Sequence, residues 1–336
     1  MAGTGGHDGG EAIADEPRTP SAPGSGESSD GTGAAAVGRP SAWDFIRLAR
    51  PRQWSKGVFV LIGPMYGAFD GHEISWIAVL AAFIVFGLVS SGGYVVNDIR
   101  DREADRKHPR KRKRPIASGA IGVATARVYA AVLFAGALAL AVPVWVFSGG
   151  EAAWWMLLAA GLYAGNVLAY SLRFKRVVIL DVMSLSLGFV LRVLGGCAAV
   201  AIVPSTWLLN CTLFLAMFLA FGKRLGERRV MGDQADQTRS VQLEYTDHLL
   251  RMVVVMTAVA TLITYAGYVE AKAEDYTRGF NLLWLTMLPA TFALLRCIVL
   301  VERGEYDDPT ELASRDLPFQ IAAGVFGLVT LGVMLS

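Results

Sequence analysis

The chain has 336 residues, of which 54% are apolar and only 18% are charged, and its formal net charge is +2. A water-soluble protein of this length would carry more charge and would break its apolar residues into amphipathic periods. Here the apolar residues form blocks of roughly 18 to 25 residues, which are long enough to cross a bilayer. The composition excludes a soluble globular domain and predicts an all-α, polytopic membrane protein.

The first 40 residues differ in composition from the rest of the chain. They contain 25 Gly, Ala, Ser or Pro residues and no apolar block. Such a segment does not bury enough surface to offset chain entropy, so we expect residues 1–40 to form a disordered tail. It has no basic stretch followed by an apolar one, so we do not expect a signal peptide. Residues 41–336 are expected to form one membrane domain.

Nine membrane-spanning helices are expected in that domain. Their approximate ranges are 57–70 (a short one), 76–97, 122–147, 152–171, 177–200, 205–222, 249–271, 280–301 and 317–335. The segment before the first span and every second connection together carry 24 Lys and Arg, whereas the other connections carry only Lys272 and Arg278. By the positive-inside rule, we expect the amino terminus and the charged loops in the cytoplasm, and the carboxyl terminus outside the cell membrane.

Oxygen-bearing side chains cluster at the end of the second span. On a helix, Asn97, Asp101 and Asp105 fall at i, i+4 and i+8, and Asp98 lies one residue round, so that all four share an arc of about 100°. Acids at this depth are costly unless cations neutralise them, and hard oxygen ligands favour Mg²⁺ over zinc or copper. The alternative is a solvated loop helix whose acids pair with neighbouring arginines.

Basic residues follow this cluster and recur at the ends of other spans. The segment from Arg106 to Arg114 (RKHPRKRKR) is a basic loop that anionic lipids would attract, but the PIASG sequence after it indicates a shaped turn. Cations and aromatic residues also lie at 50–56 and 170–175, where membrane anchoring is the alternative to ligand binding. An acidic helix face beside a basic arm favours a metal-bound pyrophosphate substrate.

Ionisable residues also occur inside apolar blocks. Asp181 and Arg192 are functional candidates because charge within a membrane span is costly. They are separated by about 16 Å along a helix, so each is expected to face a central cavity or to pair with another helix. After the sixth span, Lys223, Arg224 and Glu227 share one helix face, where an ordinary surface ion pair is the alternative.

The acids of residues 304–316 have no role that we derive from the sequence. The three cysteines, Cys197, Cys211 and Cys297, lie in apolar blocks without metal-like spacing, and we interpret them as buried thiols. The chain has no nucleotide P-loop, zinc pattern or nucleophile triad.

The spacing Asn97-Asp98-x-x-Asp101-x-x-x-Asp105 resembles the first aspartate-rich motif of the UbiA superfamily of intramembrane prenyltransferases. The resemblance covers nearly everything after about residue 45. It implies nine transmembrane helices around a central cavity, with motifs in the cytoplasmic loops after helices two and six. Within the superfamily, the chain is most similar to the phosphoribosyltransferases that act on decaprenyl phosphate and supply a precursor of cell-wall arabinan. Residues 50–56, 105–119, 170–175, 222–227 and 304–316 carry that similarity.

Two departures from the wider superfamily bear on the substrate. The second Asp-x-x-x-Asp motif, expected after helix six, is replaced by Lys223-Arg224-x-x-Glu227, and the nearby Asp233 and Asp236 have the wrong spacing. The replacement favours the phosphoribosyl subfamily over a two-metal prenyl diphosphate site. In addition, Gly57 stands where the family has an Asn, so a polar contact from that side chain is missing.

The resemblance implies transfer of 5-phosphoribose from phosphoribosyl pyrophosphate (PRPP) to a polyprenyl phosphate, with release of pyrophosphate. It implies Asp98, Asp101 and Asp105 as the catalytic acids, and these three with Asn97 as the Mg²⁺ ligands. The implied substrate-binding residues are Arg52, Lys56, Lys111, Arg112, Arg114, Tyr170, Lys175, Lys223, Arg224 and Glu227.

The partners expected on this basis are the two substrates and the lipid bilayer, without nucleic acid, and a homo-oligomer is compatible with the sequence. One rival is a UbiA-type prenyltransferase that moves a prenyl group from its diphosphate to an aromatic or glycerophosphate acceptor. A second rival is a non-enzymatic polyprenyl-phosphate carrier.

Overall fold

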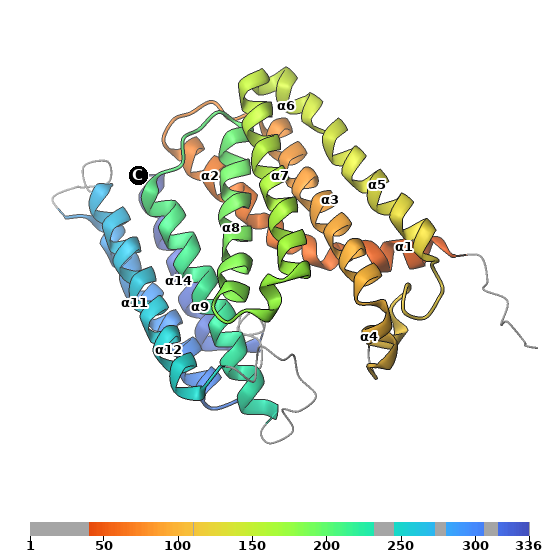
Figure 1. Ribbon diagram of the computed structural model, residues 1–336. Helices are drawn as coiled ribbons and strands as arrows, with labels where there is room; N and C mark the ends of the chain where they lie inside the picture. The colour runs from red at the N-terminus through yellow and green to blue at the C-terminus, as the bar shows by residue number, and fades with distance from the viewer. Residues whose placement is uncertain (1–39, 110, 232–244, 273–279, 306–314, 336) are drawn as a thin grey trace, which may run out of the picture. The chain divides into compact units, whose positions relative to one another are not determined.

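The computed structural model describes residues 40–109, 111–231, 245–272, 280–305 and 315–335. All of these residues belong to one compact unit that runs from Gly38 to Ser336. Most of the expected tail, the acids Asp233 and Asp236, and most of the 304–316 segment lie outside the described residues. The described part is built from helices joined by turns (Figure 1).

Within the described ranges, eight helical segments are long and apolar enough to cross a membrane. They are α3 (Trp76–Arg100), α5 with α6 (Val123–Ala139 and Ala141–Ser148), α7 (Gly150–Leu172), α8 (Leu180–Ala199), α9 (Thr206–Met231), α11 (Asp247–Ala271), η5 with α12 (Leu282–Thr286 and Met287–Glu302) and α14 (Leu317–Met334). They correspond to eight of the nine spans expected from the sequence.

The expected first span is shorter than the others. It consists of α2 (Val58–Phe69), which has 12 residues and contains Pro64, and it is preceded by the 3-10 helix η1 (Pro51–Gly57). Twelve residues of α-helix extend only about 18 Å, well short of the hydrocarbon core of a bilayer. The count of nine spans is therefore not confirmed for the described residues, although the expectation that this segment is short is correct.

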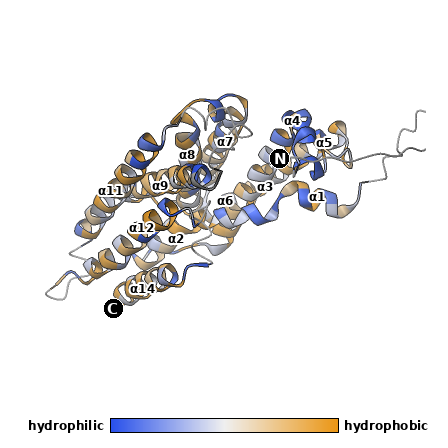
Figure 2. Cartoon of the chain, turned by 90° about the horizontal axis from the view of Figure 1, so that it is seen from below, coloured by the Kyte–Doolittle hydropathy of each residue, from blue (hydrophilic) through white to orange (hydrophobic). Residues whose placement is uncertain are grey.

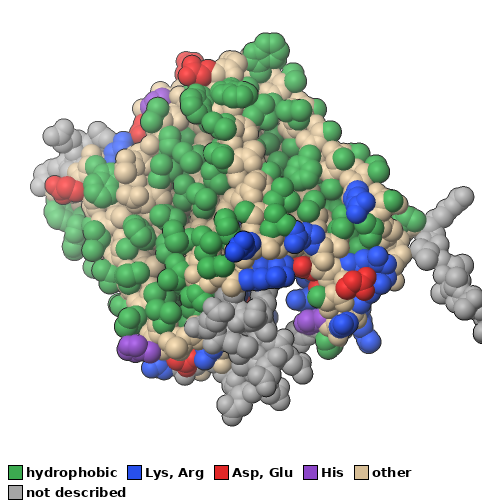
Figure 3. Space-filling view, viewed as in Figure 1, with side chains coloured by type: hydrophobic (Ala, Val, Ile, Leu, Met, Phe, Trp, Pro, Cys, Tyr) green, Lys and Arg blue, Asp and Glu red, His purple; other side chains and the backbone are tan. Residues whose placement is uncertain are grey.

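Apolar side chains cover most of the helical surface on the face seen in Figure 3. Large side chains such as Val132, Trp154 and Leu328 are between 60% and 72% exposed. A soluble protein rarely leaves so many large apolar side chains uncovered, whereas lipid tails cover them in a bilayer. Together with the eight spans, this surface identifies a multi-pass membrane protein.

The helices α3 and α8 are the most buried of the eight spans. Small residues allow their neighbours to approach closely: Gly92 on α3 lies under the Phe134 ring, and Gly196 on α8 packs against the backbone of Val60 on α2. Close packing through small residues is the usual way in which helices associate in a membrane. Because α3 carries Asn97 and Asp98, and α8 carries Asp181 and Arg192, part of the candidate site is built on these well-packed helices.

A short amphipathic helix, α1 (Ala42–Ala49), and η1 lie against α3. The side chain of Trp54 donates a hydrogen bond to Ser91 Oγ at 3.0 Å, and Ser91 in turn donates to the carbonyl of Ala49 at 2.7 Å. Arg50, between the two helices, has a φ of 53°, a left-handed conformation that ends α1 and precedes η1. These contacts hold the Arg50 side chain near the end of α3.

Candidate active site

The aspartate-rich segment continues as a helix beyond the apolar part of α3. The amide of Asp101 donates to the carbonyl of Asn97 at 2.9 Å, and the amide of Asp105 donates to the carbonyl of Asp101 at 2.8 Å. The helical path thus passes from α3 into α4 (Arg102–Lys107), the hydrophilic element in Figure 2. Asn97, Asp101 and Asp105 lie on successive turns and all line one central cavity, as their spacing predicts.

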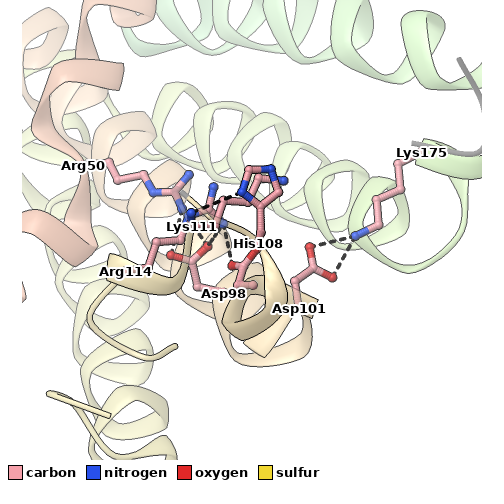
Figure 4. Close-up of polar contacts among 8 residues, drawn as sticks. Arg50, Asp98, Asp101, His108, Lys111, Arg114 and Lys175 are labelled. Atoms are coloured by element: carbon pink, nitrogen blue, oxygen red, sulfur yellow. Dashed lines mark hydrogen bonds and ion pairs between the residues drawn. The ribbon is translucent and has the colours of Figure 1, made fainter. Parts of the chain in front are cut away.

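Asp98 points in a different direction. Its carboxylate is 2% exposed and accepts two hydrogen bonds from Arg50, at 2.6 and 2.8 Å, and one from Arg114 at 3.2 Å. It lines a separate, smaller cavity of about 180 Å³ together with these two arginines. Figure 4 shows both guanidinium groups converging on it. In this structure Asp98 is therefore the centre of an ion-pair cluster and not a lining residue of the central cavity.

Two cations contact the cavity carboxylates. Arg114, which also contacts Asp98, donates to Asp105 Oδ2 at 2.7 Å. Lys175 lies in the 3-10 turn η3 (Phe174–Arg176) between α7 and α8, and its Nζ lies 2.9 and 3.0 Å from the two carboxylate oxygens of Asp101 (Figure 4). The ion pair between Lys175 and Asp101 thus connects segments that are more than 70 residues apart in the sequence, at the mouth of the cavity.

The turn after the basic arm is well packed, as its sequence indicates. Ile116 and Ile121 are 1% exposed and belong to a core cluster with residues of α1, α3 and α5. The amide of Ile121 donates to the carbonyl of Pro115, and Arg106 donates to the carbonyl of Ala117. This packing fixes the position of Arg114 and of the short helix η2 (Lys111–Lys113) beside α4.

The sequence-derived substrate-binding residues divide into two groups. The central cavity, of about 390 Å³, is lined by Lys56, Lys111, Arg114, Tyr170 and Lys175. Arg52, Arg112, Lys223, Arg224 and Glu227 are not among its lining residues. The structure therefore lines one cavity with five of the ten. The other five do not line it, although Arg224 lies close enough to Tyr170 for an electrostatic interaction.

Arg224, on α9, takes part in a buried network with Asp181 at the start of α8. It donates to Glu227 at 3.0 Å and to Asp181 at 3.4 Å, and Tyr245 donates to the second oxygen of Asp181 at 2.6 Å. The Tyr245 hydroxyl also accepts the amide proton of Ile179 at 2.7 Å. Burial and the hydrogen bond to Asp181 raise the pKa of Tyr245 above its usual range, so its hydroxyl remains a donor. Asp181 thus pairs with another helix, α9, in agreement with one of the two expectations for it.

The deep part of the cavity carries polar groups besides Arg192 that the sequence did not indicate. They are Ser90, Tyr163, Asn166 and Ser184, and they lie among the apolar Val167, Leu185 and Phe189 in its lining. Arg192 faces this cavity, in agreement with one of the two expectations for it. Arg50, which contacts Asp98, was not among the site residues predicted from the sequence, where Arg52 was named instead. The choice between these two arginines depends on the left-handed turn at Arg50, for which the local sequence carries no clear signal.

The donor set of the central cavity suits a hard divalent cation. Asn97, Asp101 and Asp105 present oxygen atoms from one helix face. Mg²⁺ commonly takes one or two carboxylates and completes its shell with water and substrate phosphates. No group of three His, Cys, Asp or Glu side chains placed to hold a metal is found within the described ranges. The residues therefore fit a cation that is bound jointly with a phosphorylated ligand better than one held by protein alone.

A family model described as the UbiA prenyltransferase family matches residues 57–322. The chain belongs to this family. A relative from Mycolicibacterium smegmatis named decaprenyl-phosphate phosphoribosyltransferase is 34% identical over 290 residues, which cover 82% of this chain and 87% of the relative. A protein of the same name from Mycobacterium tuberculosis is 33% identical over 282 residues, covering 83% of this chain and 90% of that protein.

Solved structures of the UbiA family share the fold of this chain. The structure of a UbiA homolog from Archaeoglobus fulgidus bound to GPP and Mg²⁺ superimposes with a TM-score of 0.61 at 18% identity, covering 87% of this chain and 100% of that one. The same homolog bound to DMAPP and Mg²⁺ gives a TM-score of 0.62, also at 18% identity, covering 87% of this chain and 99% of that one. The UbiA fold expected from the aspartate-rich motif is therefore confirmed.

Proposed function

We propose that this UbiA-family protein transfers the 5-phosphoribosyl group of PRPP to a polyprenyl phosphate, decaprenyl phosphate being the model acceptor, and releases pyrophosphate. The relatives named decaprenyl-phosphate phosphoribosyltransferase, which match most of the chain at 33–34% identity, support this reaction class. The coarser conclusion, a transferase that acts on a polyprenyl phosphate, rests on the same similarity.

The observation that favours a phosphosugar donor is the composition of the cavity. One aspartate-bearing helix faces a cavity that is also lined by cations from three other segments, Lys56, Lys111 and Lys175. The segment that holds a second acidic motif elsewhere in the superfamily here carries Arg224, whose charge is neutralised by Glu227 and Asp181 outside the cavity lining. A compact anion with a polar body suits this cavity better than an apolar prenyl diphosphate does.

In the proposed reaction, the bond between ribose C1 and the pyrophosphate oxygen breaks, and pyrophosphate leaves with the electron pair. An oxygen of the polyprenyl phosphate forms the new bond to C1. The acceptor is already an anion, so no side chain has to remove a proton. The task of the protein is to neutralise the departing charge, and cations fixed in a partly dehydrated cavity are effective at this.

Asn97, Asp101 and Asp105 would hold the Mg²⁺ that we include in this proposal. When bound, such an ion supplies charge neutralisation on the pyrophosphate oxygens and orients the donor. Lys175 and Arg114, which now contact Asp101 and Asp105, are close enough to share the same ligand. Asp98 acts in this proposal as a positioning residue, because its ion pair helps to fix Arg114.

We also propose that these residues face the cytoplasm of the cell that carries the protein in its inner membrane. The distribution of Lys and Arg among the connections supports this orientation through the positive-inside rule. PRPP is a soluble, highly charged donor, so its binding cavity has to open to the compartment that contains it.

Purified protein in detergent or nanodiscs, incubated with decaprenyl phosphate, MgCl₂ and radiolabelled PRPP, tests the reaction. The expected result is a lipid-soluble labelled product that is abolished by EDTA and restored by Mg²⁺. A matched incubation replaces PRPP with geranylgeranyl diphosphate and an aromatic or glycerophosphate acceptor. Turnover of that diphosphate with PRPP unused overturns the proposal in favour of a prenyltransferase. Lipid binding without any turnover favours a polyprenyl-phosphate carrier.

A further inference from the structure

The central cavity is lined by a buried arginine from α8. Arg192 lies 12 residues after the first residue of α8, about 18 Å along that helix. Its side chain is buried, with the residue 5% exposed, inside a segment long and apolar enough to span the membrane. The same cavity is lined at its other extreme by Asp101 and Asp105, so the acids and this arginine share one continuous space.

The contacts of Arg192 are all with neutral groups. Its Nη2 donates to the Tyr163 hydroxyl at 2.6 Å, and its Nη1 donates to the Gly188 carbonyl at 3.0 Å. The guanidinium group also lies over the ring of Tyr163, 4.4 Å from the ring centroid. In the part of the chain that the structure describes, no carboxylate forms an ion pair with it, whereas Asp101 and Asp105 are each paired with a cation.

A buried guanidinium without a counter-ion is costly in a membrane protein. The cost is recovered when a ligand brings an anion into the cavity. Arginine suits a phosphate monoester in particular, because its planar fork matches two phosphate oxygens. The observation therefore points to a ligand phosphate and not to a structural ion pair.

The surroundings of Arg192 are also suited to a polar ligand. Tyr163 donates a hydrogen bond to Ser90 at 3.3 Å, and Asn166 and Ser184 bond to each other and line the same space. The apolar space nearby is separate. Phe189 lines the central cavity and packs its ring against Phe59, which lines a distinct apolar cavity of about 610 Å³.

We propose that Arg192, with Tyr163, forms a phosphate-monoester subsite at the floor of the cavity, and that this subsite binds the 5-phosphate of the donor. This inference rests on the proposed function. The pyrophosphate of the same donor then lies at the mouth, beside Asp101 and Lys175. The phosphate of the acceptor is also a monoester. Around Arg192, however, the cavity presents the polar groups of Ser90, Asn166 and Ser184 beside the apolar Leu185 and Phe189, and these polar groups suit the ribose of the donor better than a long apolar chain.

The test compares PRPP with ribose 1-pyrophosphate, which lacks the 5-phosphate, in the wild type and in Arg192→Gln and Arg192→Lys. The wild type is expected to prefer PRPP by at least about 100-fold in kcat/KM, because an unfilled charged subsite discriminates strongly. Arg192→Gln is expected to lose most of that preference, and Arg192→Lys is expected to retain part of it. The KM for decaprenyl phosphate should stay within about threefold of the wild-type value, since the acceptor is assigned elsewhere.

A binding measurement on the wild type does not depend on how the variants fold. Ribose 5-phosphate should raise the thermal unfolding temperature of the purified protein, whereas ribose should not. If ribose 5-phosphate has no effect beyond that of ribose, the inference is wrong.

Three kinetic outcomes are diagnostic. If Arg192→Gln slows both donors equally, Arg192 has a structural role and the inference fails. If the donor preference survives and the KM for decaprenyl phosphate rises instead, the subsite holds the acceptor phosphate, which overturns the donor assignment. If the wild type does not use PRPP at all, the proposed function is wrong. That result comes from the wild type alone and does not depend on any Arg192 variant.

Discussion

Lys175 Nζ lies 2.9 Å from Asp101 Oδ2, and this ion pair joins the turn between α7 and α8 to the end of α3 at the mouth of the cavity. Both side chains keep some contact with solvent, with exposures of 16% and 32%. A partly exposed ion pair contributes little to stability, about 1 kcal/mol or less. Because the ion pair lies in the same cavity lining as Asp105 and Asn97, we expect it to contribute to ligand binding and not mainly to stability.

We therefore predict that Asp101→Ala and Lys175→Ala each lower kcat/KM for PRPP by at least about 100-fold, because Asp101 would hold the Mg²⁺ that neutralises the departing pyrophosphate and Lys175 would contact the pyrophosphate directly. Thermal unfolding in detergent should change by only a few degrees, in keeping with the small stabilisation of an exposed pair. The double variant should be less impaired than the product of the two single effects, since both side chains act on one ligand. Fully multiplicative effects would show that the two side chains act on different groups.

Asp98 is expected to behave differently from Asp101, although the two are close in sequence. Asp98→Asn leaves Arg50 and Arg114 without their shared counter-charge, and removal of one partner from a buried ion-pair cluster is strongly destabilising. Because both arginines are about a quarter exposed, we predict a loss of about 2–3 kcal/mol, less than for fully buried pairs.

The measurement for Asp98 is thermal or chemical unfolding of Asp98→Asn beside Asp101→Asn, which serves as the matched control. Asp101→Asn should unfold close to the wild type and lose activity. Equal unfolding of the two variants would contradict the assignment of Asp98 to the ion-pair cluster.

Tyr245 is predicted to position the turn that carries Lys175. Its hydroxyl accepts the amide proton of Ile179, a β-branched residue with a φ of 69°, and donates to the buried carboxylate of Asp181. A positive φ at such a residue is strained and persists only where its surroundings hold it.

Tyr245→Phe removes both hydrogen bonds and keeps the ring packing against Phe221. We expect a loss of about 2–3 kcal/mol in stability, because a buried amide and a buried carboxylate each lose a partner. We also expect a rise in the KM for PRPP through displacement of Lys175. A variant that loses stability while its KM is unchanged would limit Tyr245 to a structural role.

The sequence predicted the part of the site that depends on local helical spacing. Asn97, Asp101 and Asp105 share a face because helical periodicity alone places them there. The part that was missed depends on contacts across the fold. Arg50, and not Arg52, contacts Asp98, because the turn at Arg50 is held in place by the hydrogen bond between Trp54 and Ser91.

Arg224 shows the same limit. Its position on one face of α9 with Glu227 follows from sequence spacing, but its burial depends on Asp181, 43 residues earlier in the chain. Hydropathy predicted the eight long spans for a similar reason, since the length of an apolar block is a local property. It did not decide whether the short α2 segment counts as a ninth span.

Gly196 is predicted to be essential for the packing of α8 on α2. A Cβ atom at this position would lie 1.9 Å from the carbonyl oxygen of Val60, and a backbone atom cannot move aside as a flexible side chain can. Gly196→Ala should destabilise the protein by about 3 kcal/mol or more through overpacking. Gly161→Ala on α7 is the control, because a Cβ atom there meets nothing within 4 Å. Its stability should be equal to the wild type or about 1 kcal/mol higher, since Ala favours helix more than Gly does.

The last prediction concerns pH and the helix α14. Asp316 caps this helix by accepting the amide proton of Phe319 at 2.8 Å, and it also accepts from Arg296 of α12 at 2.8 and 3.2 Å. These bonds from Arg296 and Phe319 lower the pKa of Asp316 below its usual range. A lowered folded-state pKa stabilises the fold above the unfolded pKa, near pH 4, and the contribution is lost as the pH falls further through the folded pKa.

Asp316→Asn keeps an oxygen to cap Phe319 and removes only the charge. The difference in unfolding temperature between wild type and Asp316→Asn should therefore be constant from about pH 8 to pH 5 and should shrink below about pH 4. Asp316→Ala should cost about 1 kcal/mol more than Asp316→Asn at every pH, because it also removes the cap. A wild-type advantage over Asp316→Asn that grows on acidification would contradict the direction of the pKa shift, since protonation of Asp316 removes the only charge by which the two proteins differ.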